Sequence, residues 1–353
     1  MTMTLLLDEI IAGVTHACGA DRRLVHVHVA ASDLVECSDA GVAGALRARF
    51  MQSADTAGVR VEMLPRAGLP EWMLVVSAVA DVRREPRHQS ELVSEAIHGD
   101  AVTPLRAESE WTLVRMDDGY IGWIRDWHLA RWSETDRAAF ASAATHRVRS
   151  NHAIVLGEND VPLAELVAGT PVAAADGARR GWMTVRLADG RTGAVARTSL
   201  EKLRKRRPTP ERLAETGRRF IGIPYLWGGT TPNGFDCSGL IQRVYRLNGL
   251  LLPRDSDQQA RFGVEKVVSG PENVAPGDLL FFGRARDSIT HVGLVLPDRT
   301  FLHSYGQVTV NAVDPSHPRY SERLASIWQL TRDPVRNRAS NRRLDERGTP
   351  ETP

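Results

Sequence analysis

The sequence predicts an α+β protein in which a small N-terminal α/β segment and two small β-barrels precede a domain of helices packed on an antiparallel sheet. Three observations predict this: an internal repeat of strand-like segments joined by Gly-containing turns, a stretch of apolar residues at helical spacing that begins at a cysteine, and strand-like segments after it. The 353 residues allow two to four domains. We expect them at 1–74, 75–133, 142–203 and 208–333, followed by a disordered tail over 334–353 that is poor in apolar residues.

The N-terminal segment gives the weakest signals. Residues 24–29 alternate as a strand does, 42–50 indicate a short helix, and 59–63 indicate another strand. His26 and His28 fall on one face of the first strand, which raises a metal site as one interpretation. No third ligand stands nearby in the sequence, so a solvent-facing pair is favoured and no metal is expected.

The two barrels are predicted from an internal repeat. Residues 111–122 recur as 182–193 at a constant offset, and each copy is a strand, an Asp-Gly turn that favours positive φ, and a second strand. Short strands at close spacing with Gly turns are typical of small β-barrels. The barrels resemble bacterial SH3-like domains, whose Trp…Val…Asp-Gly…Gly-Trp-Ile pattern the first copy matches; the second has Ala194 in place of Trp123.

Composition argues against several classes of partner. A formal net charge of +2 gives no electrostatic reason to bind nucleic acid or an anionic membrane. The basic run 202–207 is interpreted as a solvated linker; a nucleic-acid patch is the alternative, but no aromatic residues interleave the charges. No apolar stretch is long enough to span a bilayer.

The first residues lack a basic, apolar leader, so we expect a cytoplasmic protein if Met1 is the true start, and a secreted one if a leader was trimmed.

The three cysteines are too few for a disulfide framework. Cys18 and Cys37 are expected to be buried small hydrophobes, with a disulfide between them as the minor alternative. Cys237 has a chemical use instead. It lies in Asp236-Cys237-Ser238-Gly239, after a Gly-rich loop and before apolar residues at helical spacing. We expect a helix to begin there, with N–H groups and a dipole that favour a thiolate and can stabilise an oxyanion.

Two histidines follow on strand-like segments. We expect strands over 277–282, 290–296 and 300–305, which carry His291 and His303. Pairing Gly293 with His303 brings both imidazoles onto one face, with Gly293 leaving room beside them, and requires an odd-length connection or a bulge.

The chemistry predicted from this pattern is nucleophilic catalysis without a metal or cofactor. His291 holds Cys237 as thiolate and then protonates the leaving amine, His303 orients His291, and water hydrolyses the thioester.

Residues 211–330 resemble the NlpC family of papain-like cysteine peptidases, which act on the cell wall. The resemblance implies that Cys237, His291 and His303 are the nucleophile, base and orienting residue. It also places Tyr225 in the site wall near the oxyanion, and Trp227 and Ser238 are expected in the groove. The motifs that carry it, all in family order, are Pro224-Tyr225-Leu226-Trp227-Gly228-Gly229, Phe235-Asp236-Cys237-Ser238-Gly239-Leu240, Leu252-Pro253-Arg254-Asp255-Ser256, Pro276-Gly277-Asp278-Leu279, His291-Val292-Gly293 and Leu302-His303.

The order of domains is similar to that of the γ-D-glutamyl-L-diamino-acid endopeptidases of murein-peptide recycling. That resemblance implies a substrate with a free N-terminal L-Ala, whose ammonium binds Asp255 with help from Tyr120 and Glu85 of the first barrel. For Tyr120 an exposed turn position is the alternative.

Other functions stay open at this point: a secreted wall hydrolase anchored by its barrels, a non-catalytic wall-binding protein, or amide chemistry on non-murein substrates. The oligomeric state and the identity of the diamino acid are not indicated.

Overall fold

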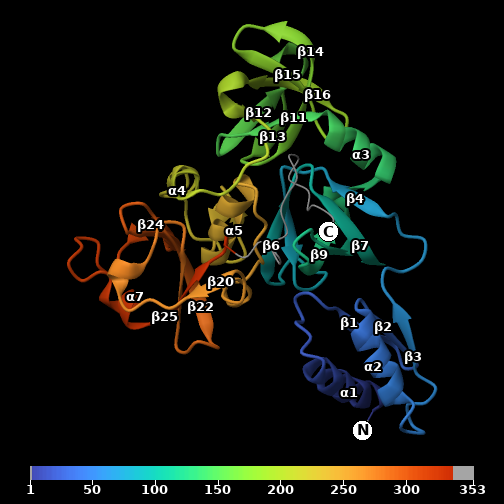
Figure 1. The fold of residues 1–353 in the computed structure, drawn as a ribbon. Coiled ribbons are helices and arrows are strands. Elements are labelled where there is room, and N and C mark those ends of the chain that lie inside the picture. The colour runs from blue at the N-terminus through green and yellow to red at the C-terminus, as the bar shows by residue number, and fades with distance from the viewer. Residues whose placement is uncertain (1, 337–353) are drawn as a thin grey trace.

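The computed structural model describes residues 2–336, which form four successive units (Figure 1). They are a small α/β unit, two seven-stranded sheets and a helix-and-sheet domain. Most of the predicted tail, residues 337–353, lies outside the described residues. Among residues 2–336 no helix combines the length and apolar character needed to cross a bilayer.

The N-terminal unit contains a helix that the sequence pattern did not reveal. Thr2 caps it by accepting a hydrogen bond from the Leu5 amide at 3.4 Å, and Leu7 and Ile10 face a separate apolar core. The predicted helix and strands are present with shifted boundaries. The elements of this unit are α1 (Met3–Ala17), β1 (Val27–Ala31), β2 (Leu34–Cys37), α2 (Ala40–Phe50) and β3 (Arg60–Met63).

The remaining predictions for this unit have mixed outcomes. His26 lies just before β1 and stacks on His28 of β1 with ring centroids 6.1 Å apart, and both are half-buried rather than solvent-facing. No group of three metal-ligating side chains occurs among the described residues. Cys37 is buried, as expected. Cys18 is exposed, because it caps the C-terminal end of α1, and neither cysteine is in a disulfide.

The two seven-stranded sheets have the same topology. The first has the order β10-β4-β7-β8-β9-β5-β6; the second, read from its other end, is β17-β11-β14-β15-β16-β12-β13, which is the same order moved along the chain by seven strands. Gly119 and Gly190 occupy the repeated turns with φ of 89° and 87°. The first sheet contains β4 (Trp72–Val75), β5 (Val79–Arg83), β6 (Leu92–Ile97), β7 (Ala101–Glu108), β8 (Trp111–Arg115), β9 (Ile121–Arg125) and β10 (Leu129–Trp132). Helix α3 (Glu134–Ala143) leads to β11 (Ala144–Val148), β12 (His152–Leu156), β13 (Pro162–Val167), β14 (Pro171–Arg179), β15 (Trp182–Arg186), β16 (Thr192–Ala196) and β17 (Leu200–Lys202).

The last domain packs α4 and α5 against a six-stranded sheet of order β20-β25-β21-β22-β23-β24. The predicted strands are β21, β22 and β23, and they are successive and antiparallel. The domain contains α4 (Pro210–Arg218), β18 (Thr230–Thr231), β19 (Gly234–Phe235), α5 (Cys237–Leu247), α6 (Ser256–Gln259), β20 (Val264–Lys266), β21 (Leu279–Gly283), β22 (Ile289–Val295), β23 (Phe301–Tyr305), β24 (Gln307–Asn311), α7 (Glu322–Ser326) and β25 (Trp328–Asp333).

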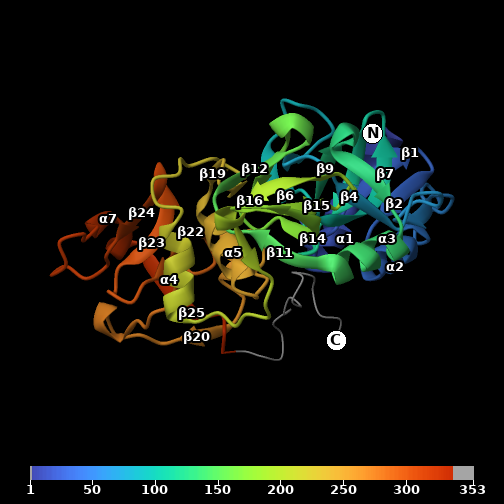
Figure 2. The ribbon, with the colours of Figure 1, turned by 90° about the horizontal axis from the view of Figure 1, so that it is seen from above.

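The first sheet is joined closely to the Gly-rich loop before α5 (Figure 2). The Thr230 amide donates to the buried Glu95 carboxylate at 2.7 Å. At Gly228, where φ is 78°, an added Cβ would lie 2.2 Å from the Leu92 carbonyl oxygen. Only glycine allows this approach, which sets the first sheet beside the start of α5.

Candidate active site

Cys237 is the first residue of α5, as the sequence predicts. Asp236 is the N-cap, and its side chain accepts a hydrogen bond from the Gly239 amide at 2.6 Å. The thiol is 8% exposed and lies 4.0 Å from the Thr290 carbonyl oxygen of β22. The nucleophile is therefore held between a helix N-terminus and the strand that carries His291.

A buried ion pair fixes this end of the helix. Arg254, 1% exposed, donates to Asp236 Oδ2 at 2.6 Å and to Oδ1 at 3.1 Å. Ser238 was expected in the groove, but its hydroxyl is buried between Asp236 (3.2 Å) and Arg254 (3.1 Å). Its side chain thus supports the helix start and does not face a substrate.

The two histidines meet in the predicted register. Leu294 pairs with Leu302 and Val295 with Phe301, and this register continued by one residue sets Gly293 opposite His303. The connection is odd in length, because Leu296 and Thr300 close a three-residue turn in which Arg299 has φ of 62°. The ring atoms His291 Nε2 and His303 Nδ1 are 2.9 Å apart.

Gly293 is needed for a different reason than expected. A Cβ there would come within 2.5 Å of the Phe301 ring, not of an imidazole. Phe301 in turn packs on His303 with ring centroids 4.9 Å apart. The glycine therefore makes room for the aromatic ring that supports His303.

Asn311 completes the relay and was missed in the sequence. Its Oδ1 lies 2.9 Å from His303 Nε2, and its Nδ2 donates to the Arg319 carbonyl oxygen at 3.3 Å. Asn311 lies on β24 opposite Phe301, diagonal to His303 on the same face. The polar alternation Gln307, Thr309, Asn311 after the Gly306 turn was the signal that would have indicated it.

This chain of contacts determines the tautomers. Since Asn311 Oδ1 can only accept, His303 carries its proton on Nε2 and presents the Nδ1 lone pair to His291. His291 must then carry its proton on Nε2, which leaves its Nδ1 unprotonated. That nitrogen is the one available to take a proton from the thiol.

Burial favours the neutral forms of both reacting groups. Burial, and next the charge of Asp236, raises the pKa of Cys237 to about 12, although hydrogen bonds from backbone N–H groups act to lower this pKa. Burial, and then His303, lowers the pKa of His291 to about 3. Burial therefore acts against the thiolate that the helix N-terminus favours, and against a charged imidazole.

Tyr225 and Trp227 lie in the loop before α5 with different exposure. Burial, and next the nearby Cys237, raises the pKa of the partly buried Tyr225 phenol, as its predicted place beside the nucleophile requires. Trp227 is 63% exposed and its indole donates to Glu91 of the first sheet at 2.9 Å. Trp227 is therefore at the rim, where the two units meet.

Asp255 and Tyr120 are brought together, but Glu85 is not. The Tyr120 hydroxyl donates to Asp255 Oδ2 at 3.1 Å, and Tyr120 is 2% exposed, which excludes the exposed-turn alternative. The Glu85 carboxylate pairs with Arg87 at 2.6 Å. Asp255 also contacts Arg23 of the N-terminal unit, whose Nη1 donates to Asp255 Oδ2 at 2.9 Å and which the sequence did not indicate.

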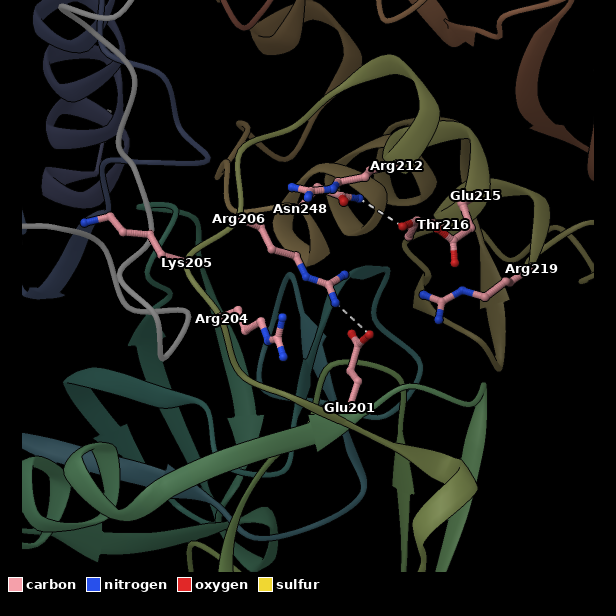
Figure 3. Close-up of a pocket in the computed structure, with 9 residues that line it drawn as sticks. All are labelled: Glu201, Arg204, Lys205, Arg206, Arg212, Glu215, Thr216, Arg219 and Asn248. Atoms are coloured by element: carbon pink, nitrogen blue, oxygen red, sulfur yellow. Dashed lines mark hydrogen bonds and ion pairs between the residues drawn. The ribbon is translucent and has the colours of Figure 1, made fainter.

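A cavity of about 220 Å³ lies at the other end of α5 (Figure 3). Arg204, Arg206, Arg212 and Arg219 line it, but Glu201 also lines it and pairs with Arg206 at 2.8 Å. Since α5 separates it from Cys237 by the length of a helix, this cavity is no part of the candidate site.

Family models match two parts of the chain. Residues 222–329 match the NlpC/P60 family, and residues 82–129 match the bacterial dipeptidyl-peptidase SH3 domain. The first match contains the cysteine and both histidines, and the second contains Tyr120.

Whole-chain comparisons agree. The chain is 28% identical to dipeptidyl-peptidase 6 of Lysinibacillus sphaericus, over 72% of this chain and 96% of that protein. It is 30% identical to γ-D-glutamyl-L-lysine dipeptidyl-peptidase of Bacillus subtilis, over 60% and 71% of the two chains. In fold it resembles an NlpC/P60 family protein from Bacillus cereus, with a TM-score of 0.64 at 20% identity, covering 75% of this chain and 99% of that one. The chain belongs to the NlpC/P60 family and is a cysteine peptidase.

Proposed function

We propose that the enzyme hydrolyses the γ-D-glutamyl–L-diamino-acid bond of murein peptides that carry a free N-terminal L-Ala. The observation that carries the proposal is the hydrogen bond from Tyr120 to Asp255, made across two domains near the nucleophile. A carboxylate oriented by a phenol is a suitable partner for an ammonium group. The two relatives described above, from Lysinibacillus sphaericus and Bacillus subtilis, are both named dipeptidyl-peptidases, which agrees with a substrate bound by its N-terminus.

The proposed reaction begins with the neutral pair. As Cys237 Sγ attacks the γ-carbonyl carbon, His291 Nδ1 takes the thiol proton, so the charges form only in the transition state. The imidazolium then protonates the departing amine of the diamino acid and the C–N bond breaks. Water attacks the thioester, gives its proton to His291, and releases the L-Ala-γ-D-Glu acid with the thiol restored.

Three further groups support the charges of this reaction. His303 holds His291 through the 2.9 Å contact, and Asn311 holds His303. The first N–H groups of α5 have no partner within the helix, so they are suited to the oxyanion that forms beside Cys237. Tyr225 adds a phenol on the same side.

The second sheet is, in this proposal, another SH3-like barrel. Its strand order repeats that of the first sheet, and its Leu187–Arg191 turn has the same hydrogen bonds as Met116–Tyr120. It contacts the far end of α5, where Arg147 donates to the Leu247 carbonyl oxygen at 2.7 Å. Its role would be to hold the catalytic helix rather than to bind the substrate.

The test compares L-Ala-γ-D-Glu-diaminopimelate, its N-acetylated form and intact murein, with products followed by mass spectrometry. We expect the free peptide to be cleaved far faster than its N-acetylated form, and no turnover by Cys237→Ala. Equal cleavage of the acetylated peptide would contradict the ammonium site, and release of peptides from intact murein would favour a wall hydrolase. The cytoplasmic location stays a prediction, and cell fractionation would check it.

A further inference from the structure

Arg23 is the point at which the N-terminal unit reaches the proposed substrate site. Its guanidinium has five N–H donors, and all of them go to three carboxylates. Nε donates to Asp21 Oδ1 at 2.8 Å, and Nη2 donates to Asp21 Oδ2 at 2.6 Å and Asp257 Oδ2 at 2.8 Å. Nη1 donates to Asp257 Oδ1 at 2.6 Å and to Asp255 Oδ2 at 2.9 Å.

The loop that carries Arg23 is held from both sides. The Ile121 amide, next to Tyr120, donates to the Arg23 carbonyl oxygen at 2.8 Å. On the other side, Gln258 of α6 donates to Asp21 at 2.9 Å. These contacts fix the guanidinium relative to both Tyr120 and Asp255, so it is a built part of the site and not a passing surface contact.

The consequence for Asp255 is that its two oxygens are no longer equivalent. Oδ2 accepts from both Tyr120 and Arg23, and Arg254 Nη1 lies 3.9 Å from Oδ1. The capping box of α6, in which the Gln258 backbone N–H faces the Asp255 side chain, also holds this carboxylate in place. Arg261 at Asp257 and Arg254 at Asp255 add two more cations beside the three carboxylates around Arg23, so what Arg23 contributes at Asp255 is the orientation of the carboxylate rather than an excess of negative charge.

Arg23 also faces a cleft of the N-terminal unit. Together with Asp257 and Gln258 it lines this cleft of about 920 Å³ between α1 and α6.

We propose that Arg23 is a specificity-determining residue, which orients Asp255 for the substrate ammonium. This inference rests on the proposed function. It gives the N-terminal unit a task at Asp255, beside Arg254 of the catalytic domain.

The test measures kcat/KM for the free and the N-acetylated tripeptide with full-length wild type, Arg23→Ala, Arg23→Lys and Arg22→Ala. Arg22 is an exposed neighbour on the same loop, so its substitution makes the same charge change without the bridge. We expect Arg23→Ala to lower the ratio of free to acetylated kcat/KM at least about tenfold, mainly through KM for the free peptide, as loss of an orienting charged hydrogen bond predicts. Arg23→Lys keeps the charge but not the planar fork, so its ratio should also fall, while Arg22→Ala keeps the wild-type ratio.

The outcomes separate the two proposals. If the wild type does not discriminate between the peptides, the proposed function fails and this inference fails with it. If the wild type discriminates and Arg23→Ala keeps the ratio, or loses both activities equally, only the inference is overturned. A wild-type ratio in Arg23→Lys, or an equal fall in Arg22→Ala, would also overturn it, because charge alone would then suffice.

Discussion

Asn311→Asp is the substitution that tests the proton relay most directly. It keeps the size of the side chain and puts a carboxylate 2.9 Å from His303 Nε2, where the wild type has an amide oxygen. Burial is the main reason that the pKa of His303 lies near 4, so the imidazole is neutral at physiological pH. A unit negative charge about 4 Å from the ring charge contributes about 4 kcal/mol at an effective dielectric constant of about 20, which is about 3 pK units. The pKa of His303 should therefore rise to about 7 in the variant.

The sign of the effect on activity follows from the tautomers. When His303 is protonated, its Nδ1–H points at His291 Nε2, which must then accept, so the proton of His291 moves to Nδ1 and the base is lost. When His303 is neutral, the wild-type arrangement returns. Activity of Asn311→Asp should be low below pH 6, should rise with a midpoint near pH 7, and should approach that of the wild type near pH 9.

The assay is kcat for the free tripeptide between pH 5 and 9, expressed as the ratio of variant to wild type. The ratio cancels titrations that both proteins share, including that of Asp255, whose pKa is raised by burial. Asn311→Ala is the control: it loses the orienting oxygen without adding charge, so its ratio should be low at every pH. An Asn311→Asp ratio that does not change with pH would refute the assignment of the relay.

Three other predictions follow from single contacts. Tyr120→Phe should raise KM for the free peptide about tenfold and leave KM for the N-acetylated peptide unchanged, because it removes one charged hydrogen bond. An equal rise in KM for the two peptides would contradict the ammonium site. The rate at which iodoacetamide alkylates Cys237 should rise steadily from pH 6 to pH 9, since the pKa of the thiol is raised to about 12. Peptide mass spectrometry distinguishes Cys237 from the exposed Cys18. A rate that does not change above pH 6 would indicate a resting thiolate. Gly228→Ala should lower the free energy of unfolding by more than about 2 kcal/mol, because its Cβ would meet a backbone oxygen at 2.2 Å. Gly222→Ala is the control: its φ is 89° but the space around it is open, so it should lower the free energy of unfolding by only about 1 kcal/mol. Equal losses in denaturant titrations would refute the steric argument.

The catalytic core was predictable because its signals are local. The N-cap, the apolar spacing of α5 and the Gly293–His303 register each follow from a short stretch of sequence and the parity of strands. The thiolate stays a prediction, because the helix N-terminus acts on Cys237 together with an opposing burial that only the folded chain creates.

The substrate end of the site was less predictable, because it depends on contacts between distant segments. Arg23 and Asp255 are 232 positions apart, and nothing in the spacing around either one indicates the other. Glu85 had the suitable charge, but its backbone places the carboxylate beside Arg87. A charged residue in a segment without motifs becomes informative only when the fold shows what it faces.

The position of Arg23 also links stability to specificity. Although burial opposes it, the hydrogen bonds from Arg23 lower the pKa of Asp257, so removing the guanidinium leaves charged carboxylates close together. The repulsion that results acts on α6, whose N-cap is Asp255 itself. A substitution at Arg23 should therefore disturb the helix start that presents the ammonium-binding oxygen, without touching the start of α5, which Arg254 and Asp236 hold separately. Selectivity is then expected to be lost before catalysis in any variant that weakens the N-terminal unit.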